Sequence, residues 1–244
     1  MMSNIASRIL HCDSACVVVN KIAGEAAEGA GRGMVNLPQL LAKELPPMPD
    51  GLALPTAVHR LDVPVSGCVV FARTGAALRL LNAALSGGAS GGVTKHYWAI
   101  VESSENNALF TQNAAEFVEL THWLQFNPRK NKSYAYDEAG PGRKKAVLCC
   151  RPVGRGDNYL FLEIELITGR HHQIRAQLER LGLHIKGDLK YGARRSERGG
   201  GIRLHARSIS FPDPSGNGNH ITVQADPPLR DNLWQAFEES LLLR

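Results

Sequence analysis

The distribution of apolar residues constrains the fold of this chain more than any other feature of its sequence. Its 244 residues hold short apolar-rich segments, separated by glycine-rich breaks, at 15–21, 67–73, 95–102, 159–167, 202–211 and 220–225. Short segments rich in β-branched and aromatic residues are typical of strands. Apolar residues at helical spacing occur at 75–85, at 169–182 and around 231–243.

Strands therefore outnumber helices, and short turns join several neighbouring strands. We predict an α+β fold with a mixed, mainly antiparallel sheet and flanking helices. We expect residues 24–39 to form a long flexible connection and the run SGGASGG at 86–92 to form a loop. Because no linker divides the sequence, we expect a single domain over residues 1–244.

Composition narrows the class of protein and its partners. The 28 lysines and arginines exceed the 23 acidic residues, and the resulting net charge of +5 favours a polyanionic partner. Five cysteines without a CxxC spacing fit neither a disulfide framework nor a zinc ribbon, which predicts reduced thiols in a cytosol-like compartment. The sequence shows no export signal and no run of the roughly 18 apolar residues that a membrane span needs.

Basic residues concentrate in two parts of the chain. Residues 128–155 hold eight of them with two acidic residues, and Tyr134 and Tyr136 are interleaved among the charges. Basic side chains for phosphates and aromatic faces for bases are typical of a nucleic-acid surface. A solvated hairpin explains this stretch about equally well, but a second basic group at 186–203 favours the nucleic-acid interpretation.

The string AVHRLDVPVSG at 57–67 places Asp62 just before an apolar strand. Burying a carboxylate costs free energy unless it pairs with a cation or takes part in catalysis. Asp62 is therefore either half of a structural salt bridge or a catalytic residue. A zinc site is disfavoured because the histidines around 169–205 lack ligand spacing. A serine hydrolase would need a GxSxG turn, which PVSGC lacks, and a carboxylate pair of Asp62 with Glu102 has no independent support.

Four ordered motifs carry a resemblance to a known family. HRLDVPVSGCVVFAR resembles the HRLDxxTSG motif of RluA-type pseudouridine synthases, and KHYWAIV resembles their KxYxAxV strand. TGRHHQIRAQLERLGLHIKGDLKYGA is similar to their GRxHQIR helix and GDxxYG turn, and LHARSISFPDP to their LHAxxLxFxHP strand. ILHCDSACVVVNKIAG resembles the opening strand and KPAG turn. The sequence departs from these motifs at Ile22, Val65, His171 and Asp213.

The resemblance implies a site and a reaction. Members of the family convert uridine in RNA into pseudouridine by breaking the bond between base and ribose, turning the base and rejoining it through carbon. The catalytic aspartate would be Asp62, acting as nucleophile or as base, and a helix arginine, Arg175 or secondarily Arg170, would keep it ionised. Tyr97 would stack on the uracil, and Arg60 would fill the gap that the flipped base leaves. The remaining expected substrate-binding residues are His59, Lys95, Lys130 and Lys132.

The family also implies the partners. We expect transfer RNA or large-subunit ribosomal RNA as substrate, no cofactor, no metal, no membrane and a monomeric, cytoplasmic enzyme. Because only eight residues precede Ile9, we expect no separate N-terminal RNA-binding domain. Two alternatives remain open: an RNA-binding module without catalysis, and a glycosidase that acts on a nucleoside with Asp62 as its nucleophile.

Overall fold

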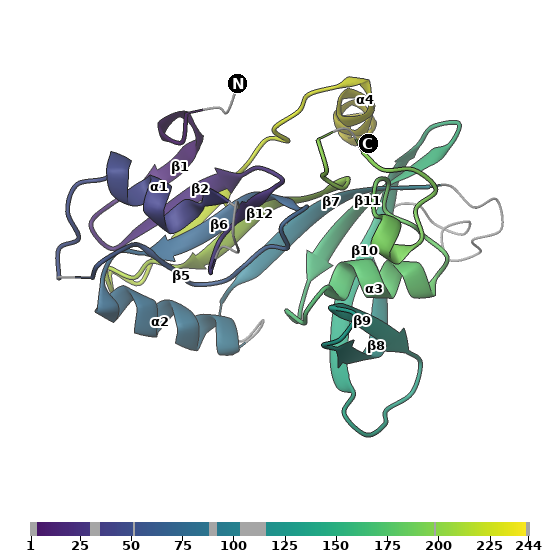
Figure 1. Ribbon diagram of the computed structural model, residues 1–244, viewed down its shortest axis with the longest axis horizontal. Coiled ribbons are helices and arrows are strands. Elements are labelled where there is room, and N and C mark those ends of the chain that lie inside the picture. The colour runs from purple at the N-terminus through teal and green to yellow at the C-terminus, as the bar shows by residue number, and fades with distance from the viewer. Residues whose placement is uncertain are drawn as a thin grey trace. The chain divides into compact units, whose positions relative to one another are not determined.

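A computed structural model describes residues 4–29, 35–50, 52–87, 92–102, 116–197 and 199–242. The chain forms two compact units, and most of their elements are labelled in Figure 1. The first unit comprises Met1–Lys95 and Ala206–Pro228, and the second comprises His96–His205 and Leu229–Arg244. The division falls within strands β7 (Thr94–Glu102) and β12 (Leu204–Pro212), so these two strands carry the chain from one unit into the other.

The first unit is a sheet with two helices. Its elements are a 3-10 turn (Ala6–Arg8), β1 (Ile9–Cys12), β2 (Cys16–Lys21), β3 (Glu25–Ala26), β4 (Val35–Asn36), α1 (Leu37–Glu44), β5 (Thr56–Ala57), β6 (Ser66–Ala72), α2 (Gly75–Ser86) and β13 (His220–Gln224). The strand order is β1-β2-β6-β12, with β13 on β12 and β5 on β6. The pairings of β1 with β2, β2 with β6, β5 with β6 and β12 with β13 are antiparallel, while β3 and β4 pair in parallel.

The core of this unit forms where α2 packs on the sheet. Leu81 of α2 packs in one buried cluster with Val18 of β2, Val70 of β6 and Phe211 of β12. Val18 lies directly opposite Val70 in the ladder, so β-branched side chains meet across the two central strands. Thr74 caps α2, because its hydroxyl accepts the N–H of Ala77 at 3.0 Å.

The second unit is an antiparallel sheet in the order β7-β11-β10-β8-β9. Its further elements are β8 (Val118–Asn127), β9 (Lys132–Tyr136), β10 (Lys144–Arg155), β11 (Tyr159–Leu166), α3 (Gln173–Arg180), a 3-10 turn (Leu189–Tyr191) and α4 (Asn232–Leu242). Helix α3 packs against β8 and β9, and helix α4 packs against β10.

Aromatic side chains anchor α4 on its sheet. The rings of Trp98 and Phe237 stack with their centroids 4.8 Å apart, and Trp234 completes the same cluster. Gly154 on β10 allows the close approach, because a Cβ there would lie 2.2 Å from the hydroxyl oxygen of Ser240 on α4. A β-bulge follows Pro152, as expected where a proline interrupts the ladder.

The predicted fold class and most predicted elements are confirmed. The exceptions are local. The expected flexible connection at 24–39 is wrong at both ends, because Glu25–Ala26 pairs with Val35–Asn36 and Asn36 caps α1, which starts at Leu37; residues 30–34 lie outside the described residues. The expected helix at 169–182 is shorter and starts at Gln173, because His172 has a left-handed backbone with φ 51°. Most of the expected loop at 86–92 lies outside the described residues. None of the helices in the described ranges is long and apolar enough to cross a membrane.

Candidate active site

Asp62 lies on a loop of the first unit, and a buried lysine binds the main chain of this loop. The loop joins β5 to β6, and its turn is closed by a hydrogen bond from the N–H of Val65 to the carbonyl oxygen of Asp62, at 2.9 Å. The side chain of Lys21, at the end of β2, is fully buried. Its ammonium donates at 2.6–3.2 Å to four main-chain carbonyl groups, those of Ile22, Asp62, Val63 and Val65.

Lys21 belongs to a small buried charge network. Burial lowers the pKa of Lys21 to about 8, while the carboxylates of Glu25 and Asp62 act in the opposite direction. Glu25 forms a two-pronged ion pair with Arg8, at 2.7 and 2.8 Å, and also accepts the N–H of Ile22 at 3.0 Å. Because Arg8 and Glu25 are both buried, this pair orders the turn that follows β2 and therefore the segment beside the loop of Asp62.

His59 attaches the start of the motif to β6. Its Nε2 atom accepts the N–H of Val70 at 3.2 Å, and Val58 donates its own N–H to the carbonyl of the same residue at 2.9 Å. Burial, with a smaller contribution from Lys95, lowers the pKa of His59 to about 3. The imidazole is therefore neutral at physiological pH. The next residue, Arg60, is exposed.

Gly67, which ends the motif, is required by a close approach of two strands. It has φ +117°, and a Cβ at this position would lie 2.3 Å from the carbonyl oxygen of Ala206 on β12. A side chain would push β12 away from β6 and shift the start of β6. The serine–glycine pair of the motif therefore has a backbone role in placing the loop of Asp62.

In the second unit, Arg175 lies inside a buried network on α3. Its guanidinium forms two hydrogen bonds with the carboxylate of Asp188, at 2.6 and 2.8 Å, and lies 4.7 Å from the ring centroid of Tyr191. The side chain of Arg175 is 5% exposed and that of Asp188 is 1% exposed. Both Asp188 and Tyr191 come from the GDLKYG turn, so this turn positions the arginine.

Tyr191 also ties the start of α3 to β9. Its hydroxyl lies 2.9 Å from Nδ1 of His172, accepts the N–H of Ser133 at 3.0 Å, and approaches the carbonyl of Ser133 at 3.2 Å. The bond to His172 positions its ring at the residue that precedes the first turn of α3, and the two bonds to Ser133 fasten Tyr191 to β9. Tyr97, on β7, is 6% exposed and lies opposite Ile164 of β11 in the ladder.

The other predicted residues of this unit differ in exposure. Lys130 and Arg170 are exposed, and the guanidinium of Arg170 donates to the carbonyl of Lys145 at 3.1 Å. The ammonium of Lys132 pairs with Glu179 of α3 at 2.8 Å. Lys132 is thus engaged within the protein, whereas Lys130 points its charge to solvent.

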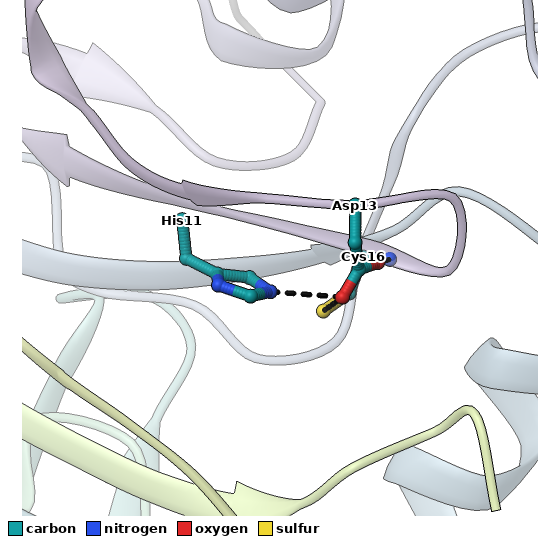
Figure 2. Close-up of side chains that lie close together, drawn as sticks. All are labelled: His11, Asp13 and Cys16. Atoms are coloured by element: carbon teal, nitrogen blue, oxygen red, sulfur yellow. Dashed lines mark hydrogen bonds and ion pairs between the residues drawn. The ribbon is translucent and has the colours of Figure 1, made fainter.

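A third cluster, in the first unit, has the atoms of a metal site. His11, Asp13 and Cys16 bring a nitrogen, an oxygen and a sulfur atom within 4.8 Å of one another (Figure 2). The carboxylate of Asp13 caps the turn between β1 and β2: one oxygen accepts the N–H groups of Ala15 and Cys16, each at 2.7 Å, and the other lies 2.9 Å from Nε2 of His11. Burial, assisted by the charge of Asp13, raises the pKa of the Cys16 thiol to about 12. Turn formation explains the cluster, and we assign it no ligand.

Comparison with known proteins identifies the class. The family model described as RNA pseudouridylate synthase matches residues 15–180. An uncharacterized RNA pseudouridine synthase of Zymomonas mobilis is 30% identical over 86% of this chain and 90% of its own length. The ribosomal large subunit pseudouridine synthase D of Xylella fastidiosa is 35% identical over 93% of this chain and 67% of its own length.

A solved structure agrees with the fold. Human RNA pseudouridylate synthase domain containing 4 has a TM-score of 0.70 at 19% identity, over 98% of this chain and 94% of the human one. The chain belongs to the RNA pseudouridylate synthase family and has its fold. It is an RNA pseudouridine synthase, an isomerase, and its substrate is RNA.

The structure distributes the predicted site residues over both units. The first unit holds His59, Arg60, Asp62 and Lys95, and the second holds Tyr97, Lys130, Lys132, Arg170 and Arg175. Sequence reasoning missed the supporting residues, above all Lys21 with Glu25, and the pairing of Asp188 with Arg175. One signal was present: Lys21 ends an apolar strand, where a lysine is expected only if its ammonium has a partner.

Proposed function

We propose that this enzyme converts specific uridines of large-subunit ribosomal RNA or transfer RNA into pseudouridine, with Asp62 as the catalytic residue. The observation that carries the assignment of Asp62 is the construction of its loop. The fully buried ammonium of Lys21 binds the main-chain carbonyl groups of Asp62 and of its neighbours Val63 and Val65. Because burying a lysine is costly, such a device indicates that the position of the loop matters to function.

The reaction then follows from simple bond changes. The bond between C1′ of the ribose and N1 of the uracil breaks, the base turns, C1′ bonds to C5, the proton of C5 passes to solvent, and N1 takes up a proton, so that the product is an isomer of uridine. Asp62 acts on the ribose or on the base, as nucleophile or as proton acceptor. We propose that Arg175 keeps this carboxylate ionised, with Arg170 as the secondary choice, and that Tyr97 stacks on the uracil.

Substrate binding is assigned to the exposed and basic residues. We propose that Arg60, which is exposed on the loop of Asp62, fills the gap left by the flipped uridine. His59, Lys95, Lys130 and Lys132 are proposed to contact the RNA. Lys130 is exposed, whereas Lys132 pairs with Glu179 and the ring of His59 accepts the N–H of Val70. The five free cysteines fit the proposed cytoplasmic location.

Tritium release tests the reaction. RNA labelled with tritium at C5 of uracil should release tritium to water without releasing free uracil, whereas a glycosidase would release the base and a binding module would release neither. Relatives that include the ribosomal large subunit pseudouridine synthases D of Xylella fastidiosa and C of Vibrio parahaemolyticus make large-subunit ribosomal RNA the first substrate to test. Mapping pseudouridines in RNA from cells with and without the gene then identifies the uridine.

A further inference from the structure

The hairpin of β8 and β9, in the second unit, has two chemically different faces. One face packs on α3: Leu124 and Ala135, which lie opposite each other in the ladder, join a cluster with Ala176 and Tyr191. Because successive strand residues point to opposite faces, their neighbours in sequence must point away from α3. The second face is thus built from Gln125, Tyr134 and Tyr136.

A pocket of about 660 Å³ opens on this second face. Its volume falls within the range of roughly 300–1,000 Å³ that small-molecule sites have. The pocket is formed by the hairpin alone, with its turn, and its lining comprises Gln125, Phe126, Asn127, Pro128, Arg129, Lys130, Tyr134 and Tyr136.

Three of the eight lining residues are aromatic. Tyr134 and Tyr136 are two residues apart on β9, so their rings follow one another along the same face at about 6–7 Å. The guanidinium of Arg143 lies 3.7 Å from the ring centroid of Tyr136, which presents a flat cation over that ring. Phe126 is 47% exposed and lies on the face of Leu124, where its ring contacts His171 with 4.3 Å between the centroids, so it borders the pocket from the side of α3. A contiguous group of aromatic surfaces rimmed by polar side chains is a candidate ligand-binding surface.

The polar atoms of the lining are basic or amide groups. Arg129 and Lys130 are exposed on the turn, and the carboxamide of Gln125 is exposed beside Tyr134. The nearby acidic residue Asp137 does not line the pocket, and its carboxylate pairs with Arg180 of α3. The pocket therefore offers flat rings, positive charge, and groups that can both donate and accept hydrogen bonds.

We propose that this pocket binds unpaired nucleobases of the RNA substrate, outside the target uridine. Aromatic rings beside basic side chains are the composition on which single-stranded nucleic acids stack, and amide groups can read the edges of a base. A protein partner of acidic character would use the lysines and arginines but would not need two consecutive tyrosine rings. The inference rests on the proposed function, because it takes RNA as the ligand.

The test separates stacking from charge. The double variant Tyr134→Leu/Tyr136→Leu removes both rings and keeps apolar side chains, and Tyr134→Phe/Tyr136→Phe is the matched control that keeps the rings. Dissociation constants are measured by fluorescence anisotropy for an RNA hairpin with an unpaired loop and for a fully paired duplex, at several salt concentrations. Each base that no longer stacks should weaken binding of the hairpin about 5- to 150-fold.

The leucine variant should bind the duplex as the wild type does, and its salt dependence should be unchanged because stacking releases no counterions. The phenylalanine control should bind both RNAs like the wild type. Equal binding of the hairpin by the leucine variant and the wild type would overturn the proposal, and so would equal losses of affinity for hairpin and duplex. A loss of affinity in the phenylalanine control as large as in the leucine variant would show hydrogen bonding by the hydroxyls and would also overturn it.

Two measurements keep the result interpretable. Thermal unfolding shows whether the double variant is folded, and the single variant Tyr136→Leu replaces it if it is not. Pseudouridine formation by the wild type is measured separately with large-subunit ribosomal RNA and transfer RNA. Hairpin binding that depends on the rings, without pseudouridine formation, would refute the proposed function and leave the pocket supported. Pseudouridine formation with binding that does not depend on the rings would refute the pocket alone.

Discussion

Replacing Lys21 should disable the enzyme without touching any group that reacts. Lys21→Met keeps a long unbranched side chain but removes the ammonium, which donates to four carbonyl groups around the loop of Asp62. An ammonium has three N–H donors, and hydrogen bonds to charged groups contribute about 1.5–3 kcal/mol each, which gives about 5–9 kcal/mol before costs. Burying the ammonium costs several kcal/mol, so the net loss of unfolding free energy should be about 1–4 kcal/mol.

The substitution should lower the rate of catalysis as well as the stability. A misplacement of about 1 Å can lower a reaction rate about 100-fold, and the carbonyl of Asp62 itself no longer receives the ammonium's hydrogen bond in this variant. We therefore expect kcat to fall about 100-fold or more, with little change in RNA binding. Tritium release under saturating RNA measures kcat, and urea unfolding measures stability. Lys43→Met, which changes an exposed lysine of the same unit, is the control. A folded Lys21→Met enzyme with wild-type kcat would refute the positioning role.

Three further predictions concern other parts of the structure. Arg175→Ala should lower the unfolding free energy by about 3–5 kcal/mol, because Asp188 stays buried without its guanidinium partner; a cost below about 1 kcal/mol in urea would contradict this. His59 stays neutral in the folded state down to a pKa of about 3, whereas the unfolded chain takes up a proton below about 6.5, so its contribution to stability falls as the pH drops through that window. The stability advantage of wild type over His59→Gln should therefore be smaller at about pH 4.5 than at pH 7 in denaturant titrations, and equal advantages would refute the assignment. The last prediction replaces three exposed lysines of residues 128–155 by glutamine: Lys130, Lys144 and Lys145. The slope of log binding constant against log salt concentration should become shallower by up to about 0.7–0.9 for each phosphate group that is no longer neutralised. An unchanged slope would indicate a solvated hairpin that does not contact RNA.

Local sequence patterns predict the helices and strands well where the type of a residue determines the backbone conformation. The apolar strands and the helix at 75–85 follow from the periodicity of apolar residues. The glycine of the PVSG string is also informative, because only glycine fits at position 67, where β12 approaches closely. The predicted start of α3 lies four residues too early, because His172 has a left-handed backbone, and its ring is hydrogen-bonded to Tyr191, a residue that is distant in sequence.

Prediction of the candidate site from the sequence is limited in the same way, by contacts between residues that are distant in the chain. Asp62 stands out in the sequence because a carboxylate precedes a buried strand, and the motif resemblance gives it a role. The function of Lys21 could not be predicted in the same way, because its partners are main-chain carbonyl groups some 40 residues away. Every residue has such a group, so the sequence does not show which ones the ammonium binds. The partner of Arg175 within its unit, Asp188, is likewise defined only when the GDLKYG turn folds against α3.

Substitution of Asp62 by asparagine tests the central claim most directly. The change removes the charge and the nucleophilic oxygen but keeps nearly the same shape, so the loop held by Lys21 should stay in place. We expect pseudouridine formation to fall by several orders of magnitude, while the dissociation constant for RNA stays within about a few fold of wild type. An Asp62→Asn enzyme that retains about a tenth of the wild-type rate, or more, would contradict the assignment of Asp62 as the catalytic residue.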